Sequence, residues 1–463
     1  MAYGGGTFVT HNKTLPGAYV NYVSGGRSPF LMSDRGVAAL PLFIDWGPEE
    51  LFEVSKQEIM QDSVSVFGYS YFAPQMLPLR ELVQADVKTV KVFRMTGETT
   101  RAVCAPDGDT VIARAKYGGP RGNALSVTIA PNVDEPSLWD VRTYLDGTLV
   151  ERQIRLTSVA DLRDNAWVTF GHAVAFGTVV AAPFTGGAAQ PVTIAAHQRA
   201  MDAFAVSGVN FNSLICPSGD PIVVAAYASY TKMHRDDFGK KFLLAAYRAN
   251  DENTGTFADY MGVTSVNASV QNLPADLSGT PWLGEWSAVY WVGGRLGAVP
   301  LTRGLEGNAN AYNGELEIFA DLRPAELERA IRNGQFVFHK NDDGQRVVLK
   351  DINSKITITD TQGVEYQLNQ VVRVCDQIAM DVADLFERRK LGSTPNDEQG
   401  RAILRADIID YLRDMERLRI VQQFDADTVE VLPGTYKEDV IVNLNGINIT
   451  AFMLKLYMTI YTI

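Results

Sequence analysis

Cysteine is scarce in this sequence, which has 463 residues and three cysteines, Cys104, Cys216 and Cys375. An odd number of widely spaced cysteines favours neither a disulfide framework nor a zinc site, and it fits assembly in a reducing cytoplasm. The first residues, MAYGGGTFVTHNK, lack the apolar stretch of a signal peptide. We therefore expect the protein to be made in the cytosol and to leave it, if at all, by a route other than secretion.

Basic residues are also in the minority. Lysine and arginine total 42 against 54 aspartates and glutamates, so the formal net charge is -12. Binding to phosphates needs a basic surface, so we expect no direct contact with nucleic acid. The 46% hydrophobic and 21% charged residues are typical of a globular protein, and the length suits about two to four domains.

No motif of a common catalytic or nucleotide-binding site is present, because the P-loop, HExxH, GxSxG and dinucleotide patterns are all missing. The five histidines lie far apart, and none has metal-ligand spacing to another histidine or cysteine. They are His11, His172, His197, His234 and His339. We predict no catalytic residue, no metal ligand and no cofactor-binding residue.

Two charged loops resemble active-site segments. HRDDFGKK contains Asp236 and Asp237, and we interpret it as a solvated turn between a helix and a strand. KYGGPRGN resembles a phosphate-binding loop, but it lies between β-rich runs, so no helix N-terminus follows that would hold an anion. We interpret it as a turn that needs positive φ at Gly118, Gly119 and Gly122.

The chain changes character along its length. Residues 93–185 contain short β-rich runs separated by turn signals, which predicts a β-sandwich or small barrel inserted as a separate domain. Strands then alternate with helices at 194–206, 221–234 and 284–299, which favours a largely parallel sheet. A further strand is predicted at 355–360.

Two long helices are predicted around 369–389 and 396–418, each with one apolar stripe. The second carries arginines beside its stripe: Arg401, Arg405, Arg413 and Arg417. They form either a solvated face or a basic surface that docks an acidic partner. Strands at 427–434 and 439–450 then return the chain to β-structure.

The chain ends in ITAFMLKLYMTIYTI, which is shorter than the roughly 20 apolar residues of a spanning helix. Its residues alternate with a period of two, as in a β-strand. One face carries Leu454, Leu456, Met458 and Ile460. Such a strand needs a partner, and two alternatives stay open: it pairs within its own sheet, or part of it pairs with another copy of the chain.

Several segments together resemble the tail sheath proteins of contractile phages, above all those of phages and phage-like elements of Gram-positive bacteria. They are GGGTFVTHNKTLPGAYVNYVS, SDRGVAALPLFIDWGP, FGYSY, LPLREL, AKYGGPRGNALSVTI and the terminal segment, and they cover nearly the whole chain in one order. AKYGGPRGN matches the family's turn in its β-rich insertion at Ala115, Lys116, Tyr117, Gly122 and Asn123.

The resemblance implies a multidomain α+β or α/β fold: an α/β sheath core with an inserted β-sandwich-like domain and extended N- and C-terminal strand arms. The expected parts are an N-terminal arm at 1–25, a first part of the core at 26–92, the insert at 93–185, an α/β sheath domain at 186–335, a C-terminal inner domain at 336–446 and a C-terminal arm at 447–463.

The family's members stack as six-fold rings around a tail tube, and their arms add strands to sheets of neighbouring copies. The resemblance assigns that role to eight residues, Tyr19, Val20, Tyr22, Val23, Leu454, Leu456, Met458 and Ile460. Arg401 and Arg405 become tube-docking candidates. The extended sheath would store free energy at assembly and contract, without a nucleotide, to drive the tube through an envelope.

The implied partners are further copies of the chain, the tail tube protein, and baseplate and tail terminator proteins, with no insertion into a membrane. The protein would be made in the host cytoplasm and end in the tail of a virion or phage-like particle. Two alternatives remain: another virion structural protein, such as a tube or capsid subunit, or an α/β-hydrolase-like enzyme that uses residues 190–320. The second lacks a visible nucleophile–base–acid set.

Overall fold

The computed structural model describes residues 32–171, 175–206, 210–248, 259–274, 277, 279–454 and 458, and the backbone of two short strands near the N-terminus. The chain forms two compact units. The first comprises residues 1–33 and 381–450, and the second comprises residues 34–380 and 451–463. The six-part division expected from the sequence stays a prediction.

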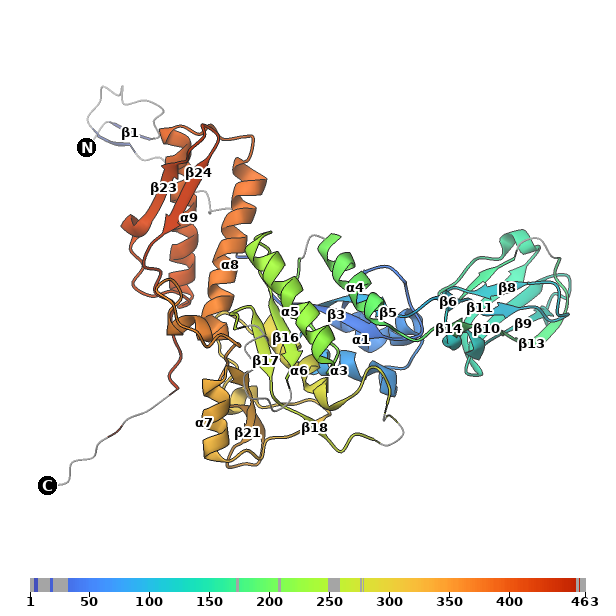
Figure 1. The fold of residues 1–463 in the computed structure, drawn as a ribbon. Helices are drawn as coiled ribbons and strands as arrows, with labels where there is room; N and C mark the ends of the chain where they lie inside the picture. Colours follow the sequence, from blue (N-terminus) through green and yellow to red (C-terminus); the bar gives the residue numbers. More distant parts are fainter. Residues whose placement is uncertain are drawn as a thin grey trace. The chain divides into compact units, whose positions relative to one another are not determined.

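A seven-stranded sheet organises the larger unit (Figure 1). Its strand order is β20 (Gln335–Phe336), β17 (Val263–Val266), β16 (Leu243–Tyr247), β15 (Ser213–Ile215), β3 (Val37–Phe43), β5 (Thr89–Met95) and β4 (Phe52–Ser55). All neighbours are parallel except β4, which is antiparallel to β5 at the edge. The predicted, largely parallel sheet is confirmed.

Two pairs of helices pack on this sheet: α4 (Ile194–Val206) with α5 (Pro221–Asp236), and α3 (Leu77–Gln84) with α6 (Ala288–Ala298). The predicted helices at 194–206 and 221–234 are confirmed. Glycines let α6 approach its neighbours, because a Cβ at Gly293 would lie 2.4 Å from a carbon of Ile215. The core is therefore closely packed at this helix.

The β-rich insert has two antiparallel sheets around a hydrophobic core of its own. One sheet runs in the order β11 (Thr148–Leu156), β10 (Trp139–Leu145), β9 (Leu125–Pro131) and β13 (Val179–Pro183). The other runs in the order β12 (Val168–Phe170), β8 (Ala113–Ala115) and β7 (Val103–Cys104). At the neck, β6 (Thr99–Thr100) pairs with β14 (Ala188–Ala189).

In the turn KYGGPRGN, the positive φ expected at all three glycines is wrong for Gly118 and Gly122. Only Gly119 of its three glycines has positive φ, at 124°. The other two are needed for close approach instead: a Cβ at Gly118 would lie 2.2 Å from Thr99 Oγ1, and one at Gly122 would lie 3.0 Å from Cβ atoms of Ala102 and Ala115. A short 3₁₀ helix, Pro120–Ala124, leads directly into β9.

The larger unit is completed by α7 (Pro324–Arg332) and the hairpin of β21 (Phe338–Lys340) and β22 (Arg346–Val348). The strand predicted at 355–360 is wrong. The N–H groups of Ile356 and Thr357 donate to the carboxylate of Asp259, at 2.6 and 3.0 Å, instead of to a neighbouring strand. A side chain about a hundred residues away therefore takes the place of a sheet partner.

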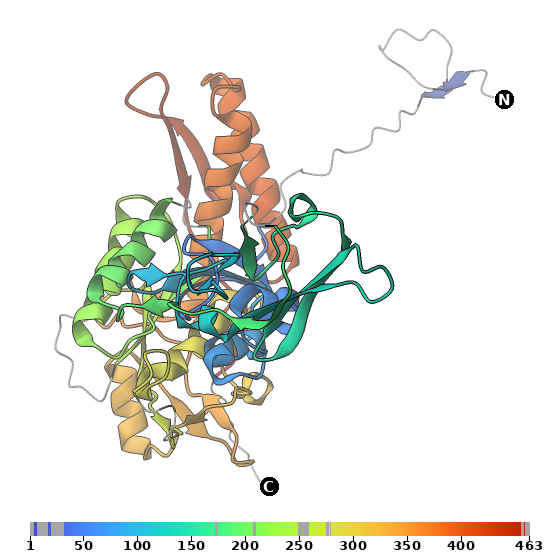
Figure 2. The ribbon, with the colours of Figure 1, turned by 90° about the vertical axis from the view of Figure 1, so that its right-hand side faces the viewer.

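The smaller unit contains the end of α8 (Asn369–Leu385), a π-helical turn at Phe386–Lys390, α9 (Glu398–Arg417), and the hairpin of β23 (Val429–Pro433) and β24 (Val440–Leu444). Figure 1 and Figure 2 both show the hairpin lying along α9. The predicted apolar stripe of α9 is buried: Leu404, Ile408, Leu412 and Met415. The two predicted long helices are confirmed.

Candidate functional site

The carboxyl ends of β3 and β15 meet where the strand order of the parallel sheet reverses, and α/β folds commonly bind ligands at such a point. His197, Cys216 and Ser218 lie near it: the His197 ring packs edge-on to Phe43, the last residue of β3, and Cys216 follows β15. This is the location that the hydrolase alternative would require.

The side chains at this point have structural partners. His197 Nδ1 lies 3.2 Å from the Tyr227 hydroxyl, and Ser218 Oγ accepts the N–H of Asp220 at 3.0 Å. The Asp220 carboxylate accepts the N–H of Ile222 at 2.8 Å and caps α5. Burial raises the pKa of the Cys216 thiol and lowers the pKa of His197. These contacts assemble no activated nucleophile.

The part of the chain that the structure describes holds no group of three or more His, Cys, Asp or Glu side chains placed to bind a metal ion. None of its described helices is both long enough and apolar enough to cross a membrane.

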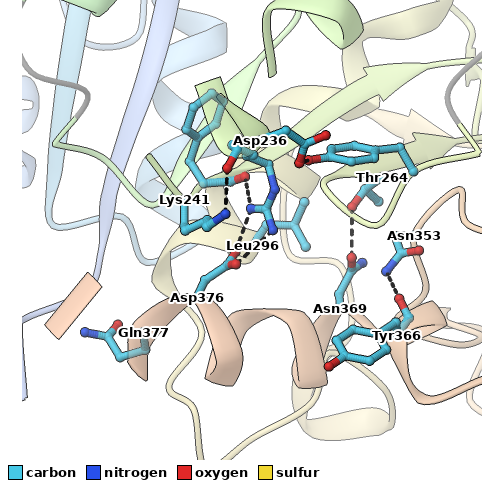
Figure 3. Close-up of polar contacts among 12 residues, drawn as sticks. Asp236, Lys241, Thr264, Leu296, Asn353, Tyr366, Asn369, Asp376 and Gln377 are labelled. Carbon is cyan, nitrogen blue, oxygen red and sulfur yellow. Dashed lines mark hydrogen bonds and ion pairs between the residues drawn. The ribbon is translucent and has the colours of Figure 1, made fainter. Parts of the chain in front are cut away.

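A buried ion pair anchors the first half of α8 to the α/β core (Figure 3). The Arg235 guanidinium, in the last turn of α5, donates to both carboxylate oxygens of Asp376, at 2.6 and 2.8 Å. It also donates to the carbonyl of Phe242 at 2.6 Å, and Lys241 Nζ donates to the carbonyl of Arg235 at 2.6 Å. One side chain therefore joins α5, the segment before β16, and α8.

A second polar cluster holds the start of α8. Arg373 lies 2.8 Å from a carboxylate oxygen of Asp351, and both side chains are fully buried. Asn369 donates to Asp351 at 2.9 Å and to the Ile352 carbonyl at 3.0 Å, and it accepts from Thr264 Oγ1 at 3.3 Å. Figure 3 shows Asn369 and Asp376 on the same side of the helix. The two clusters set the register of α8 on the core.

This anchor was not predicted from the sequence, although the sequence contains a signal for it. Asn369, Arg373 and Asp376 follow the spacing i, i+4, i+7, so they share one face of the helix, and all three are buried there. Polar residues at helix positions that face the core predict hydrogen-bonding partners that are buried with them. Their identities could not be read from the sequence, because Arg235 is 141 residues away from Asp376.

The tube-docking candidates Arg401 and Arg405 lie on one side of α9 but have different surroundings. Arg405 donates through Nε to the carbonyl of Val429 at 2.7 Å and through Nη2 to the carbonyl of Ala426 at 2.6 Å. Arg405 therefore ties α9 to the start of β23. Arg401 Nη1 donates to the carbonyl and side-chain oxygens of Asn396, at 3.1 and 3.0 Å. Docking by these two arginines stays a prediction.

The other two arginines of the predicted stripe pair with acidic neighbours one turn away. Arg413 lies 3.8 Å from Asp410, and Arg417 pairs with Asp414. Exposed pairs of this kind contribute little stability, and they neutralise the positive charge along the second half of α9. Arg405 likewise lies 3.7 Å from a carboxylate oxygen of Asp427, so three of the four arginines of the predicted stripe pair with a carboxylate.

The predicted arm residues lie at the ends of the chain. Near the N-terminus, β1 (Gly4–Gly6) pairs in parallel with β2 (Gly17–Tyr19), which ends at the predicted Tyr19. Val20, Tyr22 and Val23 lie outside the described residues, as do Leu456 and Ile460. Residues 451–454 and Met458 have no regular secondary structure, and Leu454 and Met458 are 47% and 71% exposed. Pairing of these arms with other copies stays a prediction.

Three family models match the chain in order. They are the phage tail sheath protein beta-sandwich domain over residues 84–189, the phage tail sheath protein central domain over 190–354 and the phage tail sheath C-terminal domain over 361–463. The phage-like element PBSX protein XkdK of Bacillus subtilis is 28% identical, with 95% of this chain and 94% of the relative covered.

Solved structures give the same result. The sheath tail protein of Desulfitobacterium hafniense is 28% identical with a TM-score of 0.72, covering 90% of this chain and 93% of that one. The sheath tail protein Lin1278 of Listeria innocua is 26% identical with a TM-score of 0.74, covering 91% and 94%. The anti-feeding prophage helical sheath in its contracted state shares the fold, with a TM-score of 0.57 at 12% identity, covering 97% and 99%.

Proposed function

This chain belongs to the phage tail sheath family, and we propose that it polymerises as stacked hexameric rings around a tail tube and contracts to drive the tube through a cell envelope. Sheath proteins are structural components of the tails of phages or phage-like particles. The chain is not an enzyme, which removes the hydrolase alternative, and its family separates it from tube and capsid subunits.

The β23–β24 hairpin is the observation that carries the proposal. A sheet of two strands is only marginally stable in water. Within the described residues, no third strand pairs with either outer edge of this sheet, and Arg405 occupies the carbonyl of Val429 at the start of β23. The two outer edges equal in number the two arms that each copy would supply. We infer that arms of neighbouring copies add to this hairpin by strand addition.

The charges of the hairpin and of the arms also favour strand addition of the arms to this hairpin. Residues 425–439, which include β23 and the hairpin turn, carry five acidic residues and one lysine, Lys437. Residues 1–33 carry Lys13 and Arg27 with no acidic residue, and residues 440–463 carry only Lys455. Arms without carboxylates approach an acidic hairpin with favourable electrostatics, which speeds association and selects against wrong partners.

Strand addition suits a subunit that must stay connected while it moves. Each new main-chain hydrogen bond contributes a net free energy of about 0.5–1.5 kcal/mol, and apolar burial adds about 25 cal/mol per Å². Glycines next to the pairing segments, such as Gly25, Gly26, Gly434 and Gly446, let the rigid parts rotate about the joints. Contraction would then release free energy stored at assembly, without a nucleotide.

The partners of this assembly would be further copies of the chain, the tail tube, and baseplate and terminator proteins. The smaller unit, with α9 and the hairpin, would face the tube, and the β-rich insert would lie further out. Synthesis would take place in the host cytoplasm.

Electron microscopy of the purified chain tests the proposal. We expect the protein to form hollow cylinders with six-fold end views, alone or on tubes of the tail tube protein from the same particle. A chain that is folded by circular dichroism but stays monomeric with and without tubes would contradict the proposed function. Cylinders with another rotational symmetry would contradict the hexameric ring.

A further inference from the structure

Two arginines lie directly opposite each other on the outer face of the four-stranded sheet of the β-rich insert. In the antiparallel pair of β10 and β11, Arg142 is the register partner of Arg152. Residues of β10 alternate between the two faces, and Val141 and Leu145 belong to the core, so Arg142 lies on the opposite face. Like charges in directly opposite positions destabilise a pair of strands. A local conflict of this kind is typical of a functional site.

Asp140 brings the two guanidinium groups together. Its Oδ2 lies 3.4 Å from Arg142 Nη2 and 3.3 Å from Arg152 Nη2. Its other oxygen accepts the side-chain amide of Asn132 at 2.8 Å and the N–H of Arg155 at 3.2 Å, and Asp140 is only 3% exposed. One buried carboxylate therefore orients both arginines, and the three side chains together keep one net positive charge.

The two guanidinium groups remain accessible to a ligand. The Arg142 side chain is 32% exposed and the Arg152 side chain is 49% exposed. Each guanidinium has five N–H groups in a planar fork, and among the described residues Asp140 is the one acceptor of these two side chains. Most of the donors are therefore available to an anion, and they are oriented before it binds, which lowers the entropic cost of binding.

Other acidic residues of the same sheet are engaged elsewhere. Glu135 pairs with Arg155. Glu151 is the register partner of Thr143, which is buried, so Glu151 lies on the other face of the sheet from the two arginines. Residues 93–185 carry nine basic and ten acidic residues, a net charge of -1 in a chain of -12. An anion that approaches the insert therefore meets far less repulsion than the total charge of the chain implies.

The neighbouring side chains indicate what carries the anion. Tyr144 follows two residues after Arg142 on the same face of β10 and is half-buried. On β9, Thr128 lies opposite Arg142 and Ser126 lies opposite Tyr144. An aromatic ring and hydroxyl groups beside a basic pair suit a polyol, which presents both C–H groups and hydroxyls. A tetrahedral phosphate presents oxygens in several directions, so it suits two arginine forks that converge.

We propose that Arg142 and Arg152 bind the phosphate groups of a polymer of polyol phosphate units. Each arginine donates to oxygens of one phosphate, and the polyol lies on the face formed by Tyr144, Thr128 and Ser126. The inference rests on the proposed function, in which the insert lies further out and every copy in the cylinder repeats the site. One such site binds weakly, and its repetition raises the overall affinity about 10²–10⁴-fold. The sheath would thereby hold an anionic polymer at the surface of the envelope that the tube penetrates.

Co-sedimentation of assembled cylinders with labelled poly(glycerol phosphate) tests the site. The variants are Arg142→Gln and Arg152→Gln, singly and together, since glutamine stays polar and removes the charge. The matched control is Arg114→Gln with Arg163→Gln, which removes two charges from exposed positions of the same insert. We expect the double site variant to bind at least about ten-fold more weakly and the control to stay within about two-fold of wild type.

The recognition of phosphate is tested with two further polymers at the same ionic strength. Hyaluronate carries carboxylates on a sugar chain, and duplex DNA carries phosphates without an exposed polyol face. Weaker binding of both polymers to the wild-type cylinders supports the proposal, and binding of either one that equals that of poly(glycerol phosphate) overturns it. Binding by the double site variant that equals that of the control also overturns it.

Circular dichroism and electron microscopy show whether each variant folds and assembles. Arg152→Gln alone decides the test if the double variant does not fold, because Arg152 is half exposed on the edge strand β11. Cylinders of the wild type that bind no poly(glycerol phosphate) would contradict this inference alone. A wild-type chain that binds the polymer but forms no cylinders would contradict the proposed function alone.

Discussion

Arg235 and Asp376 form a bidentate ion pair in which the guanidinium nitrogens lie 2.6 and 2.8 Å from the two carboxylate oxygens. The Arg235 side chain is 1% exposed, so the pair lies in a low-dielectric interior. It connects α5 of the parallel sheet with α8, the helix whose last residues belong to the smaller unit. The pair thus fixes the first half of α8 to α5 within the larger unit.

Removing one partner of this pair should destabilise the chain strongly. Asp376→Asn leaves a buried, uncompensated guanidinium, and we expect a loss of about 3–5 kcal/mol in the free energy of unfolding, measured by urea titration. Replacing both partners, as in Arg235→Met with Asp376→Leu, removes both charges and should restore most of that loss. Single and double variants of equal stability would show that the pair does not act as a unit.

Glu81 gives the larger unit a pH-dependent stability. Its carboxylate accepts the N–H of Glu315 at 2.7 Å and the hydroxyl of Tyr312 at 2.9 Å. Burial nevertheless raises its pKa to about 7, above the ordinary value of 4.5. Between these two values the folded chain holds a proton that the unfolded chain has lost, so stability falls as pH rises through that window.

Glu81→Gln should remove this contribution. The wild-type chain should lose on the order of 3 kcal/mol of unfolding free energy between pH 4.5 and 7 from this group, and the variant should lose correspondingly less. Urea unfolding at pH 5 and pH 7.5 measures the difference. Equal pH slopes in the two proteins would exclude Glu81 as the source.

The elements that the sequence predicts well are those whose signals are local. Asp220 and Pro221 mark the start of α5 by capping chemistry, and the apolar stripe of α9 gives its buried face directly. The strand predicted at 355–360 fails because Asp259 supplies the partner for its backbone. The alternation of apolar residues in the C-terminal segment predicts a strand. The same pattern does not identify the strand with which this segment pairs, and that strand need not belong to the same chain.

The arginines of α9 also show which features the sequence predicts and which it does not. Periodicity placed Arg401 and Arg405 on one side of α9, and it could not separate them, because their roles depend on loops that follow the helix or precede it. Arg405 finds its acceptors 21 and 24 residues later in the chain, and Arg401 finds Asn396 in the preceding loop. Side-chain partners at such distances are set by the folded chain and not by local pattern.

Arg405 should contribute to stability more than to recognition. Arg405→Ala removes the side chain that donates to the carbonyls of Val429 and Ala426, and we expect the thermal midpoint to fall and the unfolding free energy to decrease by about 1–3 kcal/mol. Arg413→Ala, on an exposed turn of the same helix, should stay within about 0.5 kcal/mol of wild type. A variant with wild-type stability that no longer docks on tubes would return Arg405 to the role predicted from the sequence.

Assembly should depend on the C-terminal arm. Removing residues 452–463 should leave a folded subunit that forms no cylinders, because Leu454 is about half exposed, Met458 is largely exposed, and neither belongs to the hydrophobic core of the single chain. A sharper version changes one strand face at a time: Leu454→Ser with Met458→Ser should abolish assembly, whereas Lys455→Ser with Thr459→Ser, on the opposite face, should be tolerated. Sedimentation velocity and electron microscopy measure assembly, and urea unfolding confirms that stability is unchanged. Efficient polymerisation of the truncated chain would show that the arm does not join neighbouring copies.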